Sequence, residues 1–358
     1  MKIDTFGVET WMNEWETKCE LNLAETCVES LSIEELLLMA GKNETDLSAL
    51  LPLKMTYGEI KGSDRLRNAI AALYNKQSSV NVVVTHGTIG ANMLVHKTLV
   101  EHGDHVISIV PTYQQHYSIP KSIGANIEFL RLHEEAGWLP DLDELQKLIV
   151  PGTKLIALTN PNNPTGTVSP TNELENFIKK VASTTIVLLD EAYTDYYDTP
   201  SMSKMIDAYP NLVIAKTFSK TFGMAGARVG YVLAHPNTIK DLNEFQAWAN
   251  AGPSAVSMQG ALAAIKDKEF VAYCKQENIK AKDILYQGFD ALGIKHIKSF
   301  TSFVYFDTAT YKKDIPALLL ANQITGARSF EQNSSWLRIS IGTVAEMEKV
   351  VAVLKLGA

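Results

Sequence analysis

A lysine flanked by hydroxyl residues, with an arginine eight positions later, is the group in this sequence best suited to covalent chemistry. Lys220 follows the predicted strand 213–216, and Thr217 and Ser219 stand just before it. Arg228 lies beyond a stretch of small residues. A lysine that carries a cofactor aldehyde as a Schiff base needs a fixed position, with anion-binding hydroxyls and a guanidinium for the cofactor's phosphate. The alternative is a surface lysine and arginine around a glycine-rich turn.

Two further polar side chains follow apolar runs of the same kind. Asn163 lies in an Asn-Pro-Thr-Gly turn after the run 154–159, and Asp190 directly follows the run 185–189. Ligands bind at the carboxyl edge of an open parallel sheet, so we expect these two residues and Lys220 to meet there. A carboxylate beside a pyridine nitrogen keeps that nitrogen protonated, which makes the ring an electron sink. Asp190 suits this role.

Other kinds of site are compatible with parts of this pattern. Asp190 followed by Glu191 could bind Mg²⁺, as in nucleotide hydrolases. That enzyme class needs a GxxxxGK[ST] phosphate loop, and a dinucleotide site needs GxGxxG after a strand. The sequence supplies neither motif, and no metal site is predicted.

A glycine-rich turn between a predicted strand and a predicted helix offers a phosphate site. Gly87, Thr88 and Ile89 follow the apolar run 82–84. The amides at a helix N-terminus and the positive end of its dipole attract anions. We therefore predict that the Thr88 hydroxyl and the amides of Thr88 and Ile89 bind phosphate, although an ordinary connecting turn has the same composition.

These motifs together resemble those of fold-type I pyridoxal-phosphate (PLP) enzymes, in particular the class I/II aminotransferases, over about residues 20–355. The histidinol-phosphate aminotransferase branch is most similar in length and in the ending Leu-Arg-Ile-Ser-Ile-Gly. The resemblance implies PLP as cofactor and an active site completed across a homodimer interface. It also implies an aspartate aminotransferase-like fold.

By this resemblance, the cofactor-binding residues take defined roles. Lys220 forms the Schiff base, and Asn163 hydrogen-bonds the phenolic oxygen of PLP. Tyr193, three residues after Asp190, could donate to the same oxygen, and Tyr113 would stack on the pyridine ring. Tyr113 could instead be an ordinary core residue.

The resemblance also implies a set of substrate-binding residues. Arg338 would clamp the substrate α-carboxylate together with Asn163. Arg328 falls near a region that holds the distal phosphate in histidinol-phosphate aminotransferases, with a surface arginine as the alternative. Tyr57 would reach the partner's cofactor phosphate, with a structural loop tyrosine as the alternative.

The N-terminal loop departs from the histidinol-phosphate aminotransferase pattern. Residues 22–31 read Asn-Leu-Ala-Glu-Thr-Cys-Val-Glu-Ser-Leu, where that branch typically carries an Asn-Glu-Asn-Pro loop over the substrate. Relatives with altered loops, such as capreomycidine synthase, act on arginine-derived substrates. Cys27 in this loop is either near the substrate or a buried inert thiol.

Composition excludes several protein classes. The chain has 358 residues, 46% hydrophobic and 20% charged, with a net charge of -7, which argues against a nucleic-acid partner. Three cysteines without CxxC spacing and no apparent signal peptide predict reduced thiols in the cytoplasm. No apolar run is long enough to span a bilayer, so no membrane partner is expected.

The predicted fold class is α/β, because short apolar runs alternate with helical patterns between residues 80 and 235. We expect a large PLP-binding domain at 46–255, with a mostly parallel sheet flanked by helices. A smaller α+β domain is expected to combine 1–45 with 256–358.

The predicted function is PLP-dependent transfer of an amino group between an L-amino acid and a 2-oxo acid, through a Lys220 Schiff base and a pyridoxamine phosphate intermediate. The first alternative is a same-fold PLP enzyme that catalyses replacement, cyclisation, elimination, decarboxylation or oxidation of an amino acid, for example an arginine derivative. The second alternative, a non-catalytic binding protein, predicts a lost cofactor lysine or an added DNA-binding domain.

Overall fold

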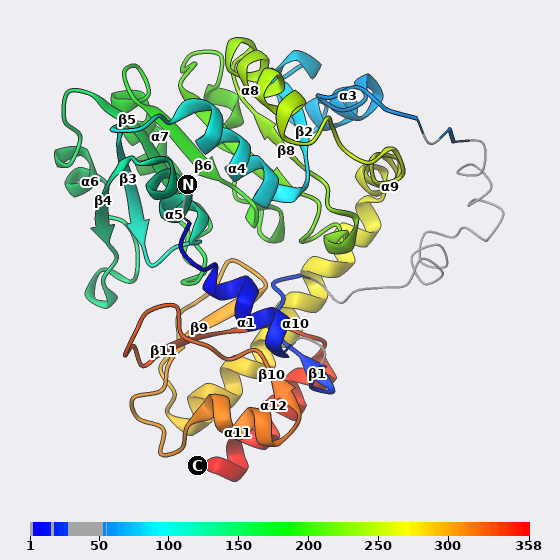
Figure 1. Ribbon diagram of the computed structural model, residues 1–358. Coiled ribbons are helices and arrows are strands. Elements are labelled where there is room, and N and C mark those ends of the chain that lie inside the picture. Colours follow the sequence, from blue (N-terminus) through cyan, green and yellow to red (C-terminus); the bar gives the residue numbers. More distant parts are fainter. Residues whose placement is uncertain (1–2, 16–17, 28–52, 55) are drawn as a thin grey trace.

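A seven-stranded sheet forms the centre of the larger part of the molecule, with strand order β2-β8-β7-β6-β5-β3-β4 (Figure 1). The computed structural model describes residues 3–15, 18–27, 53–54 and 56–358. The strands are β2 (Val82–Thr85), β3 (His105–Val110), β4 (Asn126–Arg131), β5 (Thr153–Thr159), β6 (Ile186–Asp190), β7 (Leu212–Thr217) and β8 (Gly230–Leu233). All neighbours from β4 to β7 pair in parallel, and β8 is antiparallel to both β7 and β2. The predicted mostly parallel sheet is therefore confirmed.

Helices cover both faces of this sheet, which explains the continuous apolar runs of its strands. In β6, Val187 and Leu189 join one hydrophobic cluster, and Leu188 joins the cluster on the opposite face. The helices of this part are α3 (Asp64–Ala71), α4 (Gly87–Leu99), α5 (Gln115–Ile123), α6 (Leu142–Lys147), α7 (Thr171–Val181), α8 (Pro236–Ala249) and α9 (Ala255–Lys266). Short 3₁₀ helices are η2 (Ser79–Asn81), η3 (Glu134–Ala136), η4 (Thr194–Tyr196), η5 (Met202–Met205) and η6 (Ala225–Ala227).

The smaller part contains two short sheets packed against helices. Its strands are β1 (Leu21–Asn22), β9 (Phe303–Asp307), β10 (Ile324–Thr325) and β11 (Trp336–Ser340), and its helices are α10 (Lys268–Leu292), α11 (Ile315–Ala321) and α12 (Val344–Gly357). Strand β9 pairs with β11 in antiparallel fashion, and β1 pairs with β10 in parallel. Helices α10 and α12 pack so closely that a Cβ on Gly288 would lie 2.4 Å from Val351. The predicted domain boundaries stay a prediction.

Helix α1 (Gly7–Trp15) lies at the junction of the two parts (Figure 1). On the larger part, the Gly7 amide donates to Gln114 Oε1 at 3.0 Å. On the smaller part, Trp11 lies against the Arg328 guanidinium at 5.5 Å. Residues 28–45 of the predicted small-domain segment lie outside the described residues. Across the described ranges, no helix is long and apolar enough to cross a membrane.

Candidate active site

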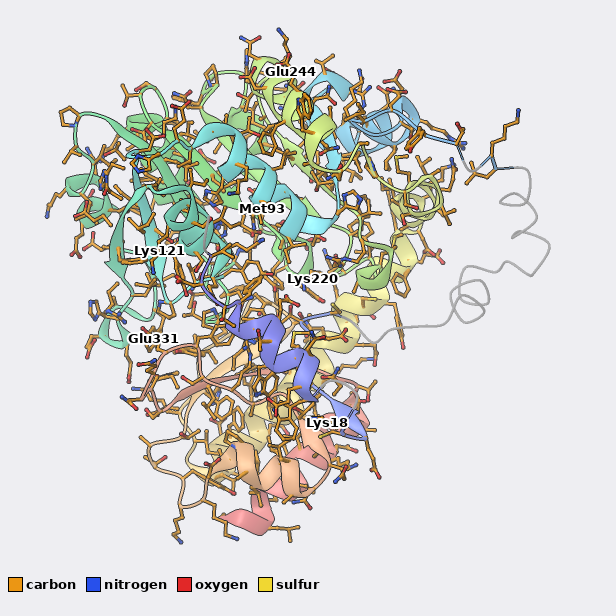
Figure 2. The ribbon with its side chains drawn as sticks, in the orientation of Figure 1. Lys18, Met93, Lys121, Lys220, Glu244 and Glu331 are labelled. Carbon is orange, nitrogen blue, oxygen red and sulfur yellow. The ribbon has the colours of Figure 1, made fainter. Side chains whose placement is uncertain are left out.

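The carboxyl ends of three adjacent strands bring Asn163, Asp190 and Lys220 to one cavity of about 410 Å³. Asp190 ends β6, Asn163 lies in the loop after β5, and Lys220 lies in the loop after β7. Lys220 is at the junction of the larger and smaller parts (Figure 2). The cavity is also lined by other predicted residues: Thr88, Ile89, Tyr113, Tyr193, Thr217, Ser219, Arg228 and Arg338.

The amine of Lys220 is held by residues from the N-terminal segment. Its Nζ donates to Thr26 Oγ1 at 2.7 Å and lies 3.9 Å from Cys27 Sγ. The Thr26 hydroxyl lies 2.9 Å from the Tyr193 hydroxyl. Burial lowers the pKa of Lys220, but Cys27 and Tyr193 favour the ammonium, and the net pKa is raised above its ordinary value.

The Asp190 carboxylate is buried and fully oriented by its neighbours. Its Oδ1 accepts from the Ala192 amide at 3.0 Å, and its Oδ2 accepts from Asn92 Nδ2 at 2.9 Å. His116 Nε2 lies 3.5 Å from the same Oδ2. Sequence reasoning missed Asn92 and His116. Asn92 lies on α4 and His116 lies on α5, and both contact Asp190 at the end of β6. No local sequence motif indicates that these side chains meet.

Two glycines allow the start of α4 and the start of β8 to approach closely. Together with Arg228 they form a small concave site, which we call the phosphate cup. Gly87 has a φ of +71°, and a Cβ there would lie 3.0 Å from Arg228 Nη2. A Cβ on Gly230 would lie 2.4 Å from the carbonyl carbon of Gly87. Glycine is therefore required at both positions for this approach of the backbone segments.

This cup fits a phosphate. Helix α4 begins at Gly87 without a side-chain N-cap hydrogen bond, so its first amides are available to an anion. Thr88 Oγ1 is buried and has no hydrogen-bond partner among the described residues. Ser219 and Arg228 also line the cavity, and the Ser219 amide donates to Thr217 Oγ1 at 3.1 Å. An anion here would satisfy the unpaired hydroxyl.

Arg338, on β11, reaches the cavity between two aromatic rings. Its Nη1 donates to Asn163 Oδ1 at 2.8 Å, and its Nη2 donates to the Ala24 carbonyl at 3.2 Å. The guanidinium lies 5.1 Å from the ring centre of Phe303 and 4.8 Å from that of Phe330. Burial lowers the pKa of Arg338 to about 10. Its Nε is buried and has no hydrogen-bond partner among the described residues.

Arg328 is buried, so the alternative interpretation of Arg328 as a surface arginine is wrong. Only 9% of its surface is exposed, and its backbone pairs with Arg338 in an antiparallel bridge. The guanidinium lies 4.2 Å from the ring centre of Phe330. Burial, followed by the charge of Arg338, lowers the pKa of Arg328 to about 9. Arg328 lies beside Arg338 and is not among the described residues on the cavity wall.

The predicted tyrosines lie in different environments. Tyr113 lines the cavity, and its ring contacts Phe6 edge-on at 5.4 Å. Tyr193 lines it too, and its hydroxyl accepts from Asn163 Nδ2 at 3.4 Å. Tyr57 is 93% exposed and lies outside the described wall of the cavity.

The N-terminal segment supplies cavity residues that sequence reasoning did not assign. Helix α1 contributes Val8, Glu9 and Met12, and residues 24–27 follow β1. These residues carry no recognisable motif, and only the path of the chain brings them to Lys220. In the portion of the chain that is described, no cluster of three His, Cys, Asp or Glu residues is placed to hold a metal.

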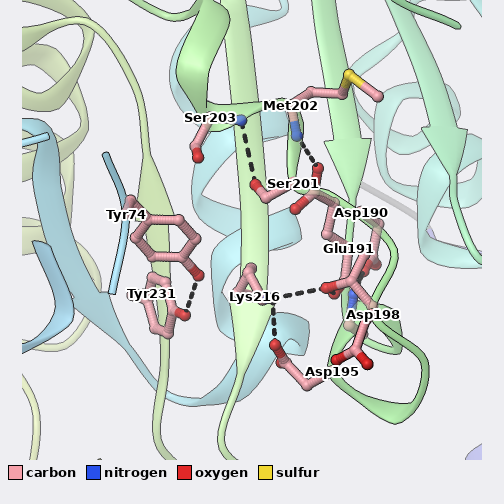
Figure 3. A network of polar contacts seen from close by, with 12 residues as sticks. Tyr74, Asp190, Glu191, Asp195, Asp198, Ser201, Met202, Ser203, Lys216 and Tyr231 are labelled. Carbon is pink, nitrogen blue, oxygen red and sulfur yellow. Dashed lines mark hydrogen bonds and ion pairs between the residues drawn. The ribbon is translucent and has the colours of Figure 1, made fainter. Parts of the chain in front are cut away.

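A second lysine, four residues before Lys220, belongs to a separate buried network (Figure 3). Lys216 Nζ donates to Thr194 Oγ1 at 2.6 Å and to Asp195 Oδ1 at 3.0 Å. Burial lowers the pKa of Lys216, but Asp195, Tyr231 and Glu191 outweigh this effect, and the net pKa is raised above its ordinary value. Lys216 therefore stabilises the strand that leads to Lys220.

Replacing Lys216 by methionine is expected to lower the free energy of unfolding by about 3 kcal/mol, because Asp195 loses its ion-pair partner and the buried Glu191 loses a nearby positive charge. The raised pKa means that this contribution is complete below the ordinary lysine pKa of 10.5 and is lost as the pH rises through the higher folded-state pKa. Urea unfolding at neutral and mildly alkaline pH should give the same difference. Lys240→Met, on an exposed side chain, is the control. A decrease of less than about 1 kcal/mol in the free energy of unfolding would contradict a stabilising role for Lys216.

Known proteins resemble this chain over most of its length. The model of the family described as aminotransferase class I and II matches residues 41–354. A histidinol-phosphate aminotransferase from Moorella thermoacetica is 30% identical over 295 residues, 81% of this chain and 75% of that protein. The corresponding enzyme from Staphylococcus epidermidis is 32% identical over 305 residues, 84% of this chain and 83% of that protein.

Solved structures show the same similarity. A PLP-dependent aminotransferase from Streptococcus suis has a TM-score of 0.90 and 29% identity, covering 99% of this chain and 98% of that chain. An aspartate aminotransferase from Thermus thermophilus, solved with maleate, has a TM-score of 0.86 and 21% identity, covering 100% of this chain and 97% of that chain. At that identity the second likeness shows the fold alone.

Proposed function

Because the chain belongs to the class I and II aminotransferase family, we propose that it transfers an amino group between an L-amino acid and a 2-oxo acid with PLP held at Lys220. Its fold is the predicted aspartate aminotransferase-like fold. The observation that carries the proposal is the meeting of Lys220, the oriented Asp190 carboxylate and a phosphate-sized cup in one cavity. The predicted large domain at 46–255 would bind the cofactor.

The residues of the cavity suit each part of PLP. The amides of Thr88 and Ile89, with the hydroxyls of Thr88, Thr217 and Ser219 and the Arg228 guanidinium, would hold the phosphate. Asp190 would bind the pyridine nitrogen, and Tyr113 would contact the ring. Asn163 and Tyr193 would bind the phenolic oxygen. When bound, PLP supplies an electron sink that stabilises negative charge at the substrate Cα.

The protein's own groups would then position the substrate and move a proton. Arg338 would hold the α-carboxylate with its unpaired Nε, while Asn163 and the Ala24 carbonyl keep the guanidinium in place. The Nζ of Lys220 would take the proton from the substrate Cα as a general base. Helix α1 contributes Val8, Glu9 and Met12 to the wall of the same cavity.

Replacing Arg338 by lysine is expected to lower kcat/KM by roughly 10- to 100-fold, mainly through KM, because a lysine keeps the charge but loses the Nε donor and the contacts to Asn163 and Ala24 that fix the guanidinium. Steady-state kinetics with the best amino donor measure this, and a PLP titration should show unchanged affinity for the cofactor. The exposed Arg65→Lys is the control. An unchanged KM would remove Arg338 from substrate binding.

An acidic residue on the cavity wall favours a second candidate, a same-fold PLP enzyme that performs replacement, cyclisation or oxidation on an arginine derivative. Glu9, from α1, lines the cavity and lies near enough to Arg328 to raise that residue's pKa. Its carboxylate could pair with a cationic substrate side chain. Elimination or decarboxylation would use the same cofactor residues, so a product assay must separate these outcomes.

The absorbance spectrum of the PLP-loaded protein, before and after a panel of single amino acids that includes arginine and glutamate, tests the proposal. Loss of the visible band with one amino acid, together with the matching 2-oxo acid, would establish amino transfer and identify the donor. Release of ammonia or peroxide would establish the second candidate. A protein that develops no band would refute both.

We also propose a cytoplasmic homodimer in which Tyr57 reaches the partner's cofactor phosphate. The exposure of Tyr57 and of Trp248, both above nine tenths, supports burial of these aromatic rings in a second copy. Analytical ultracentrifugation tests the dimer, and a monomer at assay concentration would contradict it.

A further inference from the structure

We propose that Thr26 is a positioning residue for Lys220, whose hydroxyl holds the lysine amine and links it to the Tyr193 phenol. The inference rests on the proposed function, because it assigns the residue that prepares Lys220 for proton transfer. Thr26 belongs to the N-terminal segment 22–31, which departs from the loop pattern of histidinol-phosphate aminotransferases.

Short, buried hydrogen bonds connect Lys220, Thr26 and Tyr193. Lys220 Nζ lies 2.7 Å from Thr26 Oγ1, and Thr26 Oγ1 lies 2.9 Å from the Tyr193 hydroxyl. Only 8% of Thr26 is exposed. A hydroxyl both donates and accepts, so Thr26 can accept from the ammonium while it donates to the phenol. The three groups form one hydrogen-bonded chain on the cavity wall.

The backbone around Thr26 is anchored to the smaller part of the molecule. The Ser302 hydroxyl donates to the Thr26 carbonyl at 2.9 Å, and the Ser340 amide donates to the Leu23 carbonyl at 3.2 Å. Thr26 is also β-branched, which restricts its χ1 angle. The smaller part therefore presents a fixed hydroxyl to a lysine that belongs to the larger part.

Neighbouring groups replace this contact only in part. Cys27 Sγ lies 3.9 Å from Lys220 Nζ, farther than Thr26 Oγ1 at 2.7 Å, and a sulfur atom is a weaker hydrogen-bond acceptor than a hydroxyl oxygen. Arg338 repels the ammonium. Tyr193 is held in place by Asn163 Nδ2 at 3.4 Å and by its edge-on contact with Phe303 at 5.2 Å. Without Thr26, Lys220 would keep the direct influence of the Tyr193 phenol, which favours the ammonium, but would lose its nearest hydroxyl, at 2.7 Å.

The test compares Thr26→Val, which keeps the shape and removes the hydroxyl, with Thr26→Ser, which keeps the hydroxyl. Thr153→Val is the matched control, because Thr153 is equally buried and its hydroxyl binds His105 Nδ1 at 2.9 Å away from the cavity. In the cofactor-free proteins, the pH dependence of Lys220 acetylation by acetic anhydride is followed by peptide mass spectrometry. In the PLP-loaded proteins, kcat and the isotope effect of a Cα-deuterated donor are measured.

We expect Thr26→Val to shift Lys220 acetylation to lower pH, because an ammonium loses its hydrogen-bond acceptor. We also expect kcat to fall roughly 10- to 100-fold with a larger isotope effect. Thr26→Ser should retain near wild-type values in both measurements, and Thr153→Val should match wild type.

Two results would overturn the proposal. One is a Thr26→Val protein with unchanged acetylation and kcat, and the other is equal impairment of the valine and serine variants, which would indicate packing alone. If Thr26→Val does not fold, Thr26→Ala takes its place in the same comparison. A wild-type protein without PLP-dependent turnover would refute the proposed function. The acetylation of the cofactor-free proteins would still test whether Thr26 holds the Lys220 amine.

Discussion

Replacing Lys220 by alanine is expected to reduce amino transfer by about 10⁴-fold or more, because in the proposed mechanism one side chain both anchors the cofactor aldehyde and moves the proton. Lys216 cannot take over, since its amine is bound by Thr194 and Asp195 in a separate network (Figure 3). The phosphate cup and Asp190 do not depend on the lysine. The variant should therefore still bind PLP without forming the covalent link.

Single-turnover kinetics and mass spectrometry after borohydride reduction measure the two losses separately. Wild type should gain the mass of PLP on the Lys220 peptide, and Lys220→Ala should gain none. Lys240→Ala, an exposed lysine on α8, is the control and should match wild type. Retained covalent PLP in Lys220→Ala would place the Schiff base on another residue.

Replacing Asp190 by asparagine is expected to lower kcat by about 10²- to 10³-fold, because the neutral amide no longer stabilises a protonated pyridine nitrogen. The change is close to isosteric, and the amide oxygen can still accept from the Ala192 amide, as Oδ1 does now at 3.0 Å. The new amide nitrogen would face Asn92 Nδ2, so the Asn92 amide must turn to present its unpaired Oδ1 as the acceptor. The loss should therefore appear in kcat more than in protein stability.

Rapid-scanning absorbance during a single turnover, together with thermal unfolding, separates these effects. Asp241→Asn, an exposed carboxylate on α8, is the control. A variant that unfolds at the wild-type temperature but turns over slowly would support the electronic role. Wild-type kcat would show that the Asp190 charge is not needed.

Local patterns in the sequence were sufficient to predict the central sheet and its ligand-binding edge. The apolar runs before Asn163, Asp190 and Lys220 are strands because β-branched and apolar residues continue without alternation, as expected for strands covered on both faces. Turn residues end each run, so the following polar side chains had to lie at the carboxyl edge. The glycine-rich turn at Gly87 was predictable for the same reason.

Relations between distant segments were not predictable in this way. The sequence allowed Arg328 to be a surface residue, because the local sequence does not show that the rings of Trp11 and Phe330 lie against its guanidinium. The contact of His116 with Asp190 depends on the packing of α5 against α4 and β3. Tyr57 is exposed, and its predicted role across an interface rests on the family resemblance.

The sequence by itself determined the α/β class, the strand-end positions of Lys220, Asp190 and Asn163, and the family, because these follow from spacing over a few residues. Only the tertiary structure decided that Glu9 lines the cavity and that Thr26 contacts Lys220. Thr26 and Lys220 are 194 residues apart. Their contact depends on how β1 joins β10 and how the smaller part packs on the larger one, and hydrophobic periodicity contains no information about either.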